Sequence, residues 1–267
     1  MKKNNYFQNV FDQQLEVLSI GEFEKNTPTI VLLHEGLGSL EMWKDIPEKL
    51  FKELDLNIFV YSRAGYGKSS TINLPRPINY MNLEAEKYLP KLLSEFNLTK
   101  VFLLGHSDGA TIAAINSTLK NNNYEILGTI LIAPHFFIEE MNIVSIREIR
   151  NVYEQDLKKK LSKYHNNPDI AFYGWNDVWL DDKFKNWNIT NILKDIKIPI
   201  LAIQGKDDPY GTLSQIEILE KNIKGKLNKL ILNNCGHNPL IDKPKESINK
   251  IKNFIDQIEN IQGELSL

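Results

Sequence analysis

The sequence predicts an α/β fold, in which a mostly parallel sheet is flanked by helices on both faces and a helical cap is inserted. Short runs of apolar, often β-branched residues alternate with longer segments whose apolar residues recur at helical spacing. Strands that are apolar throughout are typical of parallel sheets covered on both faces. This alternation is interrupted once, between residues 134 and 189, where aromatic residues gather and no strand is evident.

The elements follow this pattern along the chain. We expect strands at residues 14–20, 29–34, 57–61, 101–104, 126–132, 198–204 and 227–232, the first of them antiparallel. Helices are expected at residues 40–54, 81–96, 110–114, 213–224 and 248–261. The prediction therefore divides the chain into an α/β core, residues 1–133 and 190–267, and a helical cap, residues 134–189.

Within the cap segment, apolar residues from Ile146 to Tyr164 are spaced as in an amphipathic helix. Trp175 and Trp179 follow, four residues apart, so they can share one helix face. A cap over a ligand site needs an apolar wall, and we expect at least one of these two side chains to contact substrate.

Bulk composition limits the classes of protein and of partner. A chain of 267 residues can bury a large core as one domain, or as one domain with an insertion. The net charge of −2 gives no reason to expect nucleic acid or an anionic membrane as partner. The chain shows no signal-peptide core and no stretch that could span a bilayer. The single cysteine, Cys235, excludes an internal disulfide, so we expect a cytoplasmic protein; its oligomeric state is left open.

The segment around Ser107 gives the strongest functional signal. Gly105, Ser107 and Gly109 form a Gly-x-Ser-x-Gly motif between an apolar strand and a helix of small residues. A strand that turns sharply into a helix holds its turn residue in a strained conformation and exposes its side chain at the carboxyl edge of the sheet. The helix amino terminus behind the serine favours developing negative charge, as a nucleophile of acyl transfer requires.

A serine nucleophile needs a base, and the base needs an orienting acid. Asp208 ends a strand at the same sheet edge, and His237 lies in the loop after the next strand. The order serine, acid, histidine along the chain is that of α/β-hydrolases.

The chain resembles the α/β-hydrolase superfamily with a helical cap, in particular its bacterial esterase, haloperoxidase and carbon–carbon hydrolase branch. The motifs that carry the resemblance span nearly the whole chain: the loop after His34, residues 63–69, the Ser107 motif, residues 205–208 and Gly236-His237. One departure concerns the first loop, because Glu35 stands between His34 and Gly36, where the family usually has glycine directly after the histidine. The resemblance implies an oxyanion hole made by the N–H groups of Asp108 and Gly36, with Leu37 N–H as the alternative second donor.

We therefore expect a cofactor-free serine hydrolase that cleaves a carboxylic ester or thioester of a small to medium substrate through an acyl-enzyme. The same triad serves carbon–carbon bond hydrolases, lactonases and acyltransferases, and these alternatives stay open. A ligand receptor or scaffold that retains the triad without turnover is the alternative of another class. No metal-ligand spacing is present, and we expect no metal.

Other residues near these motifs are expected either to line the pocket or to support the loops around it. The expected pocket residues are Glu35, Leu37, His135, Phe136, Trp175 and Trp179. His34 and His106 are expected to support loops, His165 to be exposed, and Cys235 to be a small buried residue.

Two accounts are open for the carboxylates that flank the oxyanion donors in sequence. In one, Asp108 caps its helix and Glu35 faces solvent or pairs with Arg63. In the other, the negative field of both groups reaches the pocket.

A comparison of two adjacent aspartates tests the assignment of the acid. Only one of Asp207 and Asp208 can point at His237, and we assign Asp208 to the triad and Asp207 to a turn. We expect Asp208→Asn to lower kcat by orders of magnitude and Asp207→Asn to leave it nearly unchanged, measured as ester hydrolysis. Inactivity of the Asp207→Asn enzyme alone would reverse the assignment.

Overall fold

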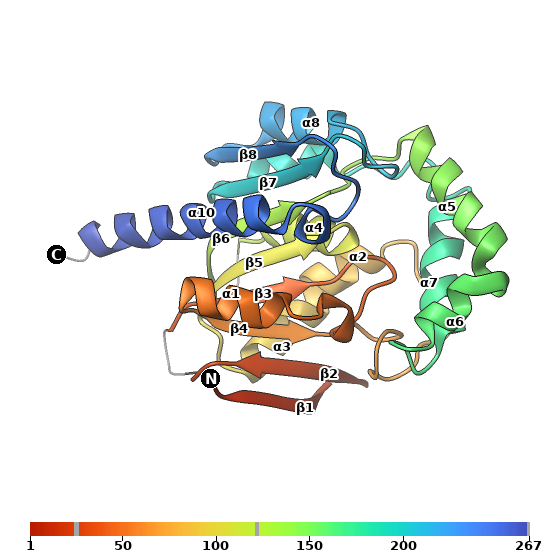
Figure 1. The fold of residues 1–267 in the computed structure, drawn as a ribbon, viewed down its shortest axis with the longest axis horizontal. Helices are drawn as coiled ribbons and strands as arrows, with labels where there is room; N and C mark the ends of the chain where they lie inside the picture. Colours follow the sequence, from red (N-terminus) through yellow and green to blue (C-terminus); the bar gives the residue numbers. More distant parts are fainter. Residues whose placement is uncertain (24–26, 121–122, 266–267) are drawn as a thin grey trace.

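The sheet is the centre of the molecule. The computed structural model describes residues 1–23, 27–120 and 123–265. The sheet has 8 strands in the order β1-β2-β4-β3-β5-β6-β7-β8 (Figure 1). Its first two strands pair antiparallel, and β2 also runs antiparallel to β4, whereas the pairs from β4 to β8 are parallel. In chain order the strands are Lys3–Val10, Gln13–Ile20, Thr29–Leu33, Asn57–Tyr61, Lys100–His106, Glu125–Ile132, Ile200–Gly205 and Leu227–Leu232.

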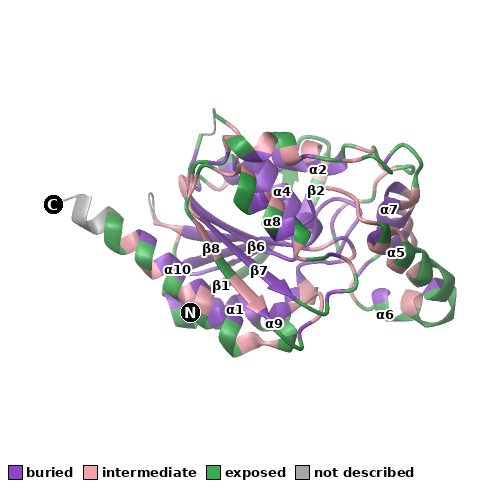
Figure 2. Cartoon of the chain, turned by 90° about the horizontal axis from the view of Figure 1, so that it is seen from above, coloured by how far each residue is buried: buried purple, intermediate pink, exposed green. Residues whose placement is uncertain are grey.

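Helices cover both faces of this sheet, as predicted, because the central strands are apolar on both sides. One hydrophobic core packs α1 (Ile46–Leu54), α9 (Pro239–Asp242) and α10 (Pro244–Leu265) on one face. The other packs α2 (Tyr80–Leu83), α3 (Leu89–Glu95), α4 (Asp108–Asn116) and α8 (Ser214–Asn222) on the opposite face. Figure 2 shows the buried strands between these two helical layers.

Three helices lie beyond the carboxyl ends of the strands (Figure 1): α5 (Glu140–Val152), α6 (Lys158–Leu161) and α7 (Pro168–Leu180). A π-helical turn, Tyr153–Leu157, joins α5 to α6. The two ends of the segment meet at an antiparallel bridge between Phe137 and Asn188, and Ile189 N–H donates to Phe136 O at 2.8 Å. This closure supports the proposal that residues 134–189 are one insertion in the core.

Two local predictions were wrong. The strand β1 was missed, because it is a polar edge strand whose side chains are largely exposed and leave no apolar run. The helix expected at residues 40–54 is broken: a 3-10 turn covers Glu41–Trp43, and α1 begins only at Ile46. Between them, Lys44 has φ of 52°, a left-handed conformation that an α-helix cannot contain.

The turn from β5 into α4 is built by three backbones in direct contact. A Cβ on Gly105 would lie 2.2 Å from Gly109 O, and a Cβ on Gly109 would lie 2.0 Å from Leu33 O. Both distances are far below van der Waals contact, so only glycine fits at either position. The contact therefore locks α4 against both β5 and β3.

Gly109→Ala tests this constraint. Because the new methyl group would meet backbone that cannot yield, we expect severe destabilisation, seen as loss of soluble folded protein or of several kcal/mol in urea unfolding. Gly174→Ala in α7 is the matched control, since its Cβ would meet nothing nearer than 3.3 Å. The control should be neutral or more stable by about 0.5–1 kcal/mol. Equal stability of the two variants would contradict the proposed contact.

Candidate active site

The serine predicted to be the nucleophile lies at the sharp turn before α4. Ser107 has φ of 53° and ψ of −118°, an unfavourable conformation for a residue with a side chain. Its N–H donates to Ile132 O at 2.9 Å, which ties the turn to the neighbouring strand. The neighbouring strand thus stabilises the strained turn. Ser107 lies at the carboxyl edge of the sheet, as the motif predicted.

Asp208 and His237 form a close pair at the same edge. The Nδ1 atom of His237 lies 2.9 Å from both carboxylate oxygens of Asp208. Two further donors hold that carboxylate: Tyr210 N–H at 2.8 Å and Gln204 Nε2 at 2.8 Å. Burial raises the pKa of Asp208, but the hydrogen bond and charge of His237 outweigh it, so the pKa is lowered. An ionised Asp208 accepts the Nδ1–H of His237, which leaves the lone pair on Nε2 free to act as a base.

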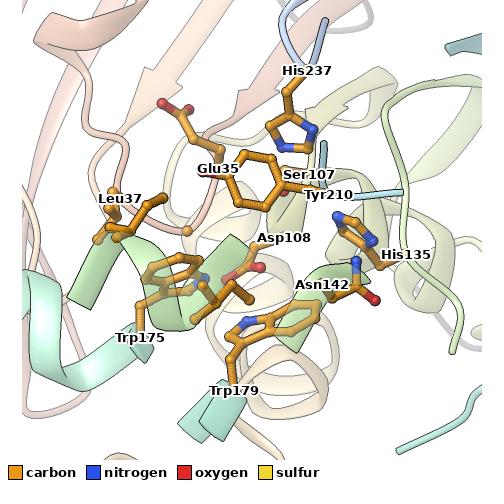
Figure 3. A pocket seen from close by; sticks show the side chains of 13 residues that line it. Glu35, Leu37, Ser107, Asp108, His135, Asn142, Trp175, Trp179, Tyr210 and His237 are labelled. Atoms are coloured by element: carbon orange, nitrogen blue, oxygen red, sulfur yellow. The ribbon is translucent and has the colours of Figure 1, made fainter. Parts of the chain in front are cut away.

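One pocket is lined by both Ser107 and His237 (Figure 3). It has a volume of about 100 Å³ and is lined by Glu35, Gly36, Leu37, Ser107, Asp108, His135, Asn142, Ile146, Ile149, Trp175, Trp179, Tyr210 and His237. Both tryptophans of α7 therefore face the predicted nucleophile. The space is smaller than the ~150 Å³ cavity that accommodates benzene, so it fits only a small group.

The loop after β3 is anchored through one carbonyl group. Glu35 O accepts from Arg63 Nη2 at 3.0 Å and from Gly38 N–H at 3.1 Å, and His34 Nδ1 lies 2.8 Å away. Across a planar trans peptide, the Gly36 N–H points opposite to the Glu35 carbonyl. Gly36 and Leu37, the two residues predicted as possible second oxyanion donors, both line the pocket with Ser107.

Two buried side chains orient this loop, as expected for His34. The Arg63 N–H donates to His34 Nε2 at 3.1 Å, so His34 must carry its proton on Nδ1 and donate to Glu35 O. Burial and the charge of Arg63 hold the pKa of His34 well below its usual range, which keeps the ring neutral. The guanidinium of Arg63 also donates to His34 O.

The two carboxylates flanking the oxyanion donors both line the pocket, and neither has the partner first expected. The Glu35 side chain pairs with His106 Nδ1 at 3.6 Å rather than with Arg63. Burial opposes ionisation of both groups, but each stabilises the charge of the other, so the pKa of Glu35 is lowered and that of His106 is raised. His106 Nε2 in turn donates to His237 O at 2.8 Å, so this pair supports the loop of the predicted base.

The Asp108 side chain does not cap its helix but is buried and accepts a hydrogen bond from the Tyr80 hydroxyl. Burial raises its pKa, while the charge of Arg63 and the Tyr80 hydroxyl act in the opposite direction. The Asp108 side chain therefore lies at the pocket wall. This is the position required by the account in which the field of Glu35 and Asp108 reaches the pocket.

Two residue predictions were wrong. His165 was expected to be exposed, but it is only 3% exposed: it accepts from Gly67 N–H at 2.9 Å and donates from Nε2 to Leu37 O at 3.0 Å. The sequence did not indicate this burial, because the residues around His165 are polar. The two hydrogen bonds of His165 link the helical segment to the Gly36 loop. Phe136, expected in the pocket, is wholly buried in the core and does not line the pocket.

Four pocket residues were not predicted as such: Asn142, Ile146, Ile149 and Tyr210. The helical periodicity identified the two isoleucines as apolar, but it could not show what they face. Tyr210 follows the acid by two residues, a proximity that could have suggested it. Asn142 gave no signal, because its position depends on how α5 is placed over the sheet. Cys235 is buried, as expected.

The described part of the chain contains no group of three or more His, Cys, Asp or Glu side chains placed to hold a metal ion. None of its helices is long and apolar enough to cross a membrane.

Comparisons with known proteins agree with this architecture. A family model described as alpha/beta hydrolase fold matches residues 28–145. A proline iminopeptidase of Lactobacillus acidophilus is 26% identical, covering 89% of this chain and 92% of that protein.

Two solved structures share the fold. A carboxylesterase structure from Nitrososphaera gargenis has a TM-score of 0.77 at 16% identity, covering 96% of this chain and 99% of that one. The enol-lactonase of Burkholderia xenovorans LB400 has a TM-score of 0.72 at 17% identity, covering 94% and 100%.

The buried ring of His135 gives a prediction on acid stability. Burial lowers the pKa of His135 to about 3, whereas an unfolded histidine titrates near 6.5. Between these two pH values His135 is protonated in the unfolded chain but not in the folded protein. The free energy of unfolding therefore falls as pH falls. From pH 7.5 to 5.0 this one group should cost about 2 kcal/mol.

We expect the free energy of unfolding of His135→Gln, measured with urea at pH 7.5 and 5.0, to fall by less than that of the wild type. Equal losses in the two proteins would contradict a neutral buried ring.

Proposed function

Because this chain belongs to the α/β-hydrolase superfamily, we propose that it is a serine hydrolase that cleaves a small carboxylic ester or thioester through an acyl-enzyme on Ser107. One observation carries the proposal. His237, which is paired with Asp208, and a serine held in a strained turn line the same small pocket.

The proposed reaction has two halves. His237 Nε2 removes the Ser107 hydroxyl proton as the oxygen attacks the substrate carbonyl, and the resulting imidazolium, stabilised by Asp208, gives that proton to the leaving alcohol or thiol. A water molecule, deprotonated by His237 in the same way, then attacks the acyl-enzyme and releases the acid. Asp208 stays ionised throughout and holds the tautomer.

Charge on the carbonyl oxygen would be stabilised by the N–H groups of Asp108 and Gly36. Asp108 begins α4, so its N–H is one of the groups that have no partner within the helix. Each donor of such a pair contributes roughly 3–4 kcal/mol to transition-state stabilisation in a comparable hydrolase. Helices α5 to α7 are proposed to act as the cap, since Trp175 and Trp179 close the pocket over these donors.

An aminopeptidase is the second candidate, favoured by the similarity to a proline iminopeptidase over most of both chains. An amide demands protonation of a poor leaving group, whereas activated esters do not. Turnover of L-prolyl p-nitroanilide with negligible ester hydrolysis would favour the peptidase. The same triad could also serve a lactonase, an acyltransferase or a carbon–carbon bond hydrolase.

Ester turnover by triad variants tests the proposal. We expect Ser107→Ala and His237→Ala each to lower kcat by roughly 10⁴-fold or more, with little change in urea unfolding. The volume of about 100 Å³ also predicts the highest kcat/KM for acetyl to butyryl p-nitrophenyl esters and a steep decline by octanoyl. Retention of substantial activity in either variant would show that the nucleophile or base is misassigned, and a receptor would show no turnover in the wild type.

A further inference from the structure

Three buried polar atoms of residues that line the pocket have no hydrogen-bond partner: one is His135 Nδ1, and the other two belong to Asp108 (Oδ1) and Asn142 (Nδ2). Asp108 and Asn142 are both 0% exposed. Figure 3 shows them in the half of the pocket that also holds Trp179. Buried polar groups are nearly always paired in native proteins, so unpaired ones at a cavity indicate what the cavity receives.

Whether Asp108 Oδ1 and Asn142 Nδ2 donate or accept follows from the hydrogen bond that the second polar atom of the same side chain makes. Tyr80 OH accepts from Trp179 Nε1 at 3.1 Å and donates its own proton to Asp108 Oδ2. Burial raises the pKa of Asp108, and the charge of Arg63 and this hydrogen bond offset that effect only in part. Because Oδ2 receives the Tyr80 proton, Oδ1 is the free acceptor of the carboxylate.

Asn142 is fixed at the start of α5. Its Oδ1 accepts from Glu139 N–H at 2.6 Å as part of a capping box, and this assigns the free end as the amide nitrogen. Asn142 therefore offers a donor to the pocket.

An acceptor and a donor on one wall match a hydroxyl group, which has one proton to give and lone pairs to receive. A methyl group in the same place would leave both buried atoms unpaired and so bind less favourably. An ammonium group has only donors and would leave Asn142 without an acceptor. The buried cation of Arg63 moreover already interacts with Asp108, which reduces the attraction for a second cation.

Building on the proposed hydrolase function, we propose that Asp108 and Asn142 select substrates whose acyl group carries a hydroxyl close to the scissile carbonyl. The hydroxyl donates to Asp108 Oδ1 and accepts from Asn142 Nδ2. Because the N–H of Asp108 is also a proposed oxyanion donor, the hydroxyl and the carbonyl oxygen of the substrate would both bind to this residue. The small pocket restricts this acyl group to a few carbon atoms.

The experiment compares matched phenyl esters in which a hydroxyl replaces a methyl group of similar size. The pairs are 2-hydroxypropanoate against 2-methylpropanoate and 3-hydroxybutanoate against 3-methylbutanoate, with both enantiomers of each hydroxy acid. Each kcat/KM is divided by the rate constant for hydroxide hydrolysis of the same ester, because a hydroxyl also activates the ester chemically. In at least one pair the wild type should prefer the hydroxy ester roughly tenfold or more.

Three variants locate the origin of that preference. Asp108→Asn keeps the backbone N–H but removes the charged acceptor, and Asn142→Asp keeps the acceptor for Glu139 N–H but removes the donor. We expect either change to bring the hydroxyl preference close to one. Glu35→Gln is the matched control, since that carboxylate also lines the pocket but is engaged by His106; its preference should stay within about twofold of the wild type.

The outcomes separate this inference from the function on which it rests. Failure to hydrolyse any of these esters, and phenyl acetate as a simple reference ester, would overturn the proposed hydrolase. Hydrolysis with no hydroxyl preference, or with one that Asp108→Asn retains, would overturn the subsite alone, and the unpaired atoms of Asp108 and Asn142 would then bind water. A stronger, Asp108-dependent preference for the 2-aminopropanoate ester would also overturn it, in favour of an ammonium site.

Discussion

The close contact among β3, β5 and α4 is the constraint on which the site depends. Gly109 lies against the carbonyls of Leu33 and His34, with no side chain between the backbones. This contact fixes the start of α4, where Ser107 and the Asp108 N–H lie, against the loop that carries the Gly36 N–H. The proposed nucleophile and the two proposed oxyanion donors, which come from segments far apart in sequence, are thereby held in one rigid unit.

Hydrogen bonds between buried polar groups then orient the peptide groups and side chains of that unit. Arg63 and His34 both donate to the Glu35 carbonyl and so fix the peptide plane that carries the Gly36 N–H. The Glu35–His106 pair supports the backbone of His237, while Gln204 and Tyr210 hold Asp208. His165 extends the same support to Leu37 from the helical segment. The buried polar atoms around the site that have no partner include His135 Nδ1, Gln204 Oε1, Asp108 Oδ1 and Asn142 Nδ2. The last two belong to wholly buried residues that line the pocket.

The sequence was sufficient for the parts of this structure that depend on local pattern. Apolar strands predicted the sheet, and the spacing around Ser107 predicted the turn, because only glycine tolerates such contacts. The places of Asp208 and His237 followed from strand ends meeting at one edge, and the structure brings the two together. Features that depend on packing between distant segments were missed. The burial of His165 and the position of Asn142 arise only once the helical segment lies over the sheet, and the polar strand β1 is defined by its pairing with β2.

The central claim is that Ser107 is an activated nucleophile, and covalent labelling by a fluorophosphonate tests it most directly. The account predicts rapid incorporation of one phosphonyl group per chain, mapped to Ser107 by peptide mass spectrometry. Labelling should be lost in Ser107→Ala and strongly slowed in His237→Ala. Absence of labelling in the folded wild-type protein, or labelling at another residue, would contradict it.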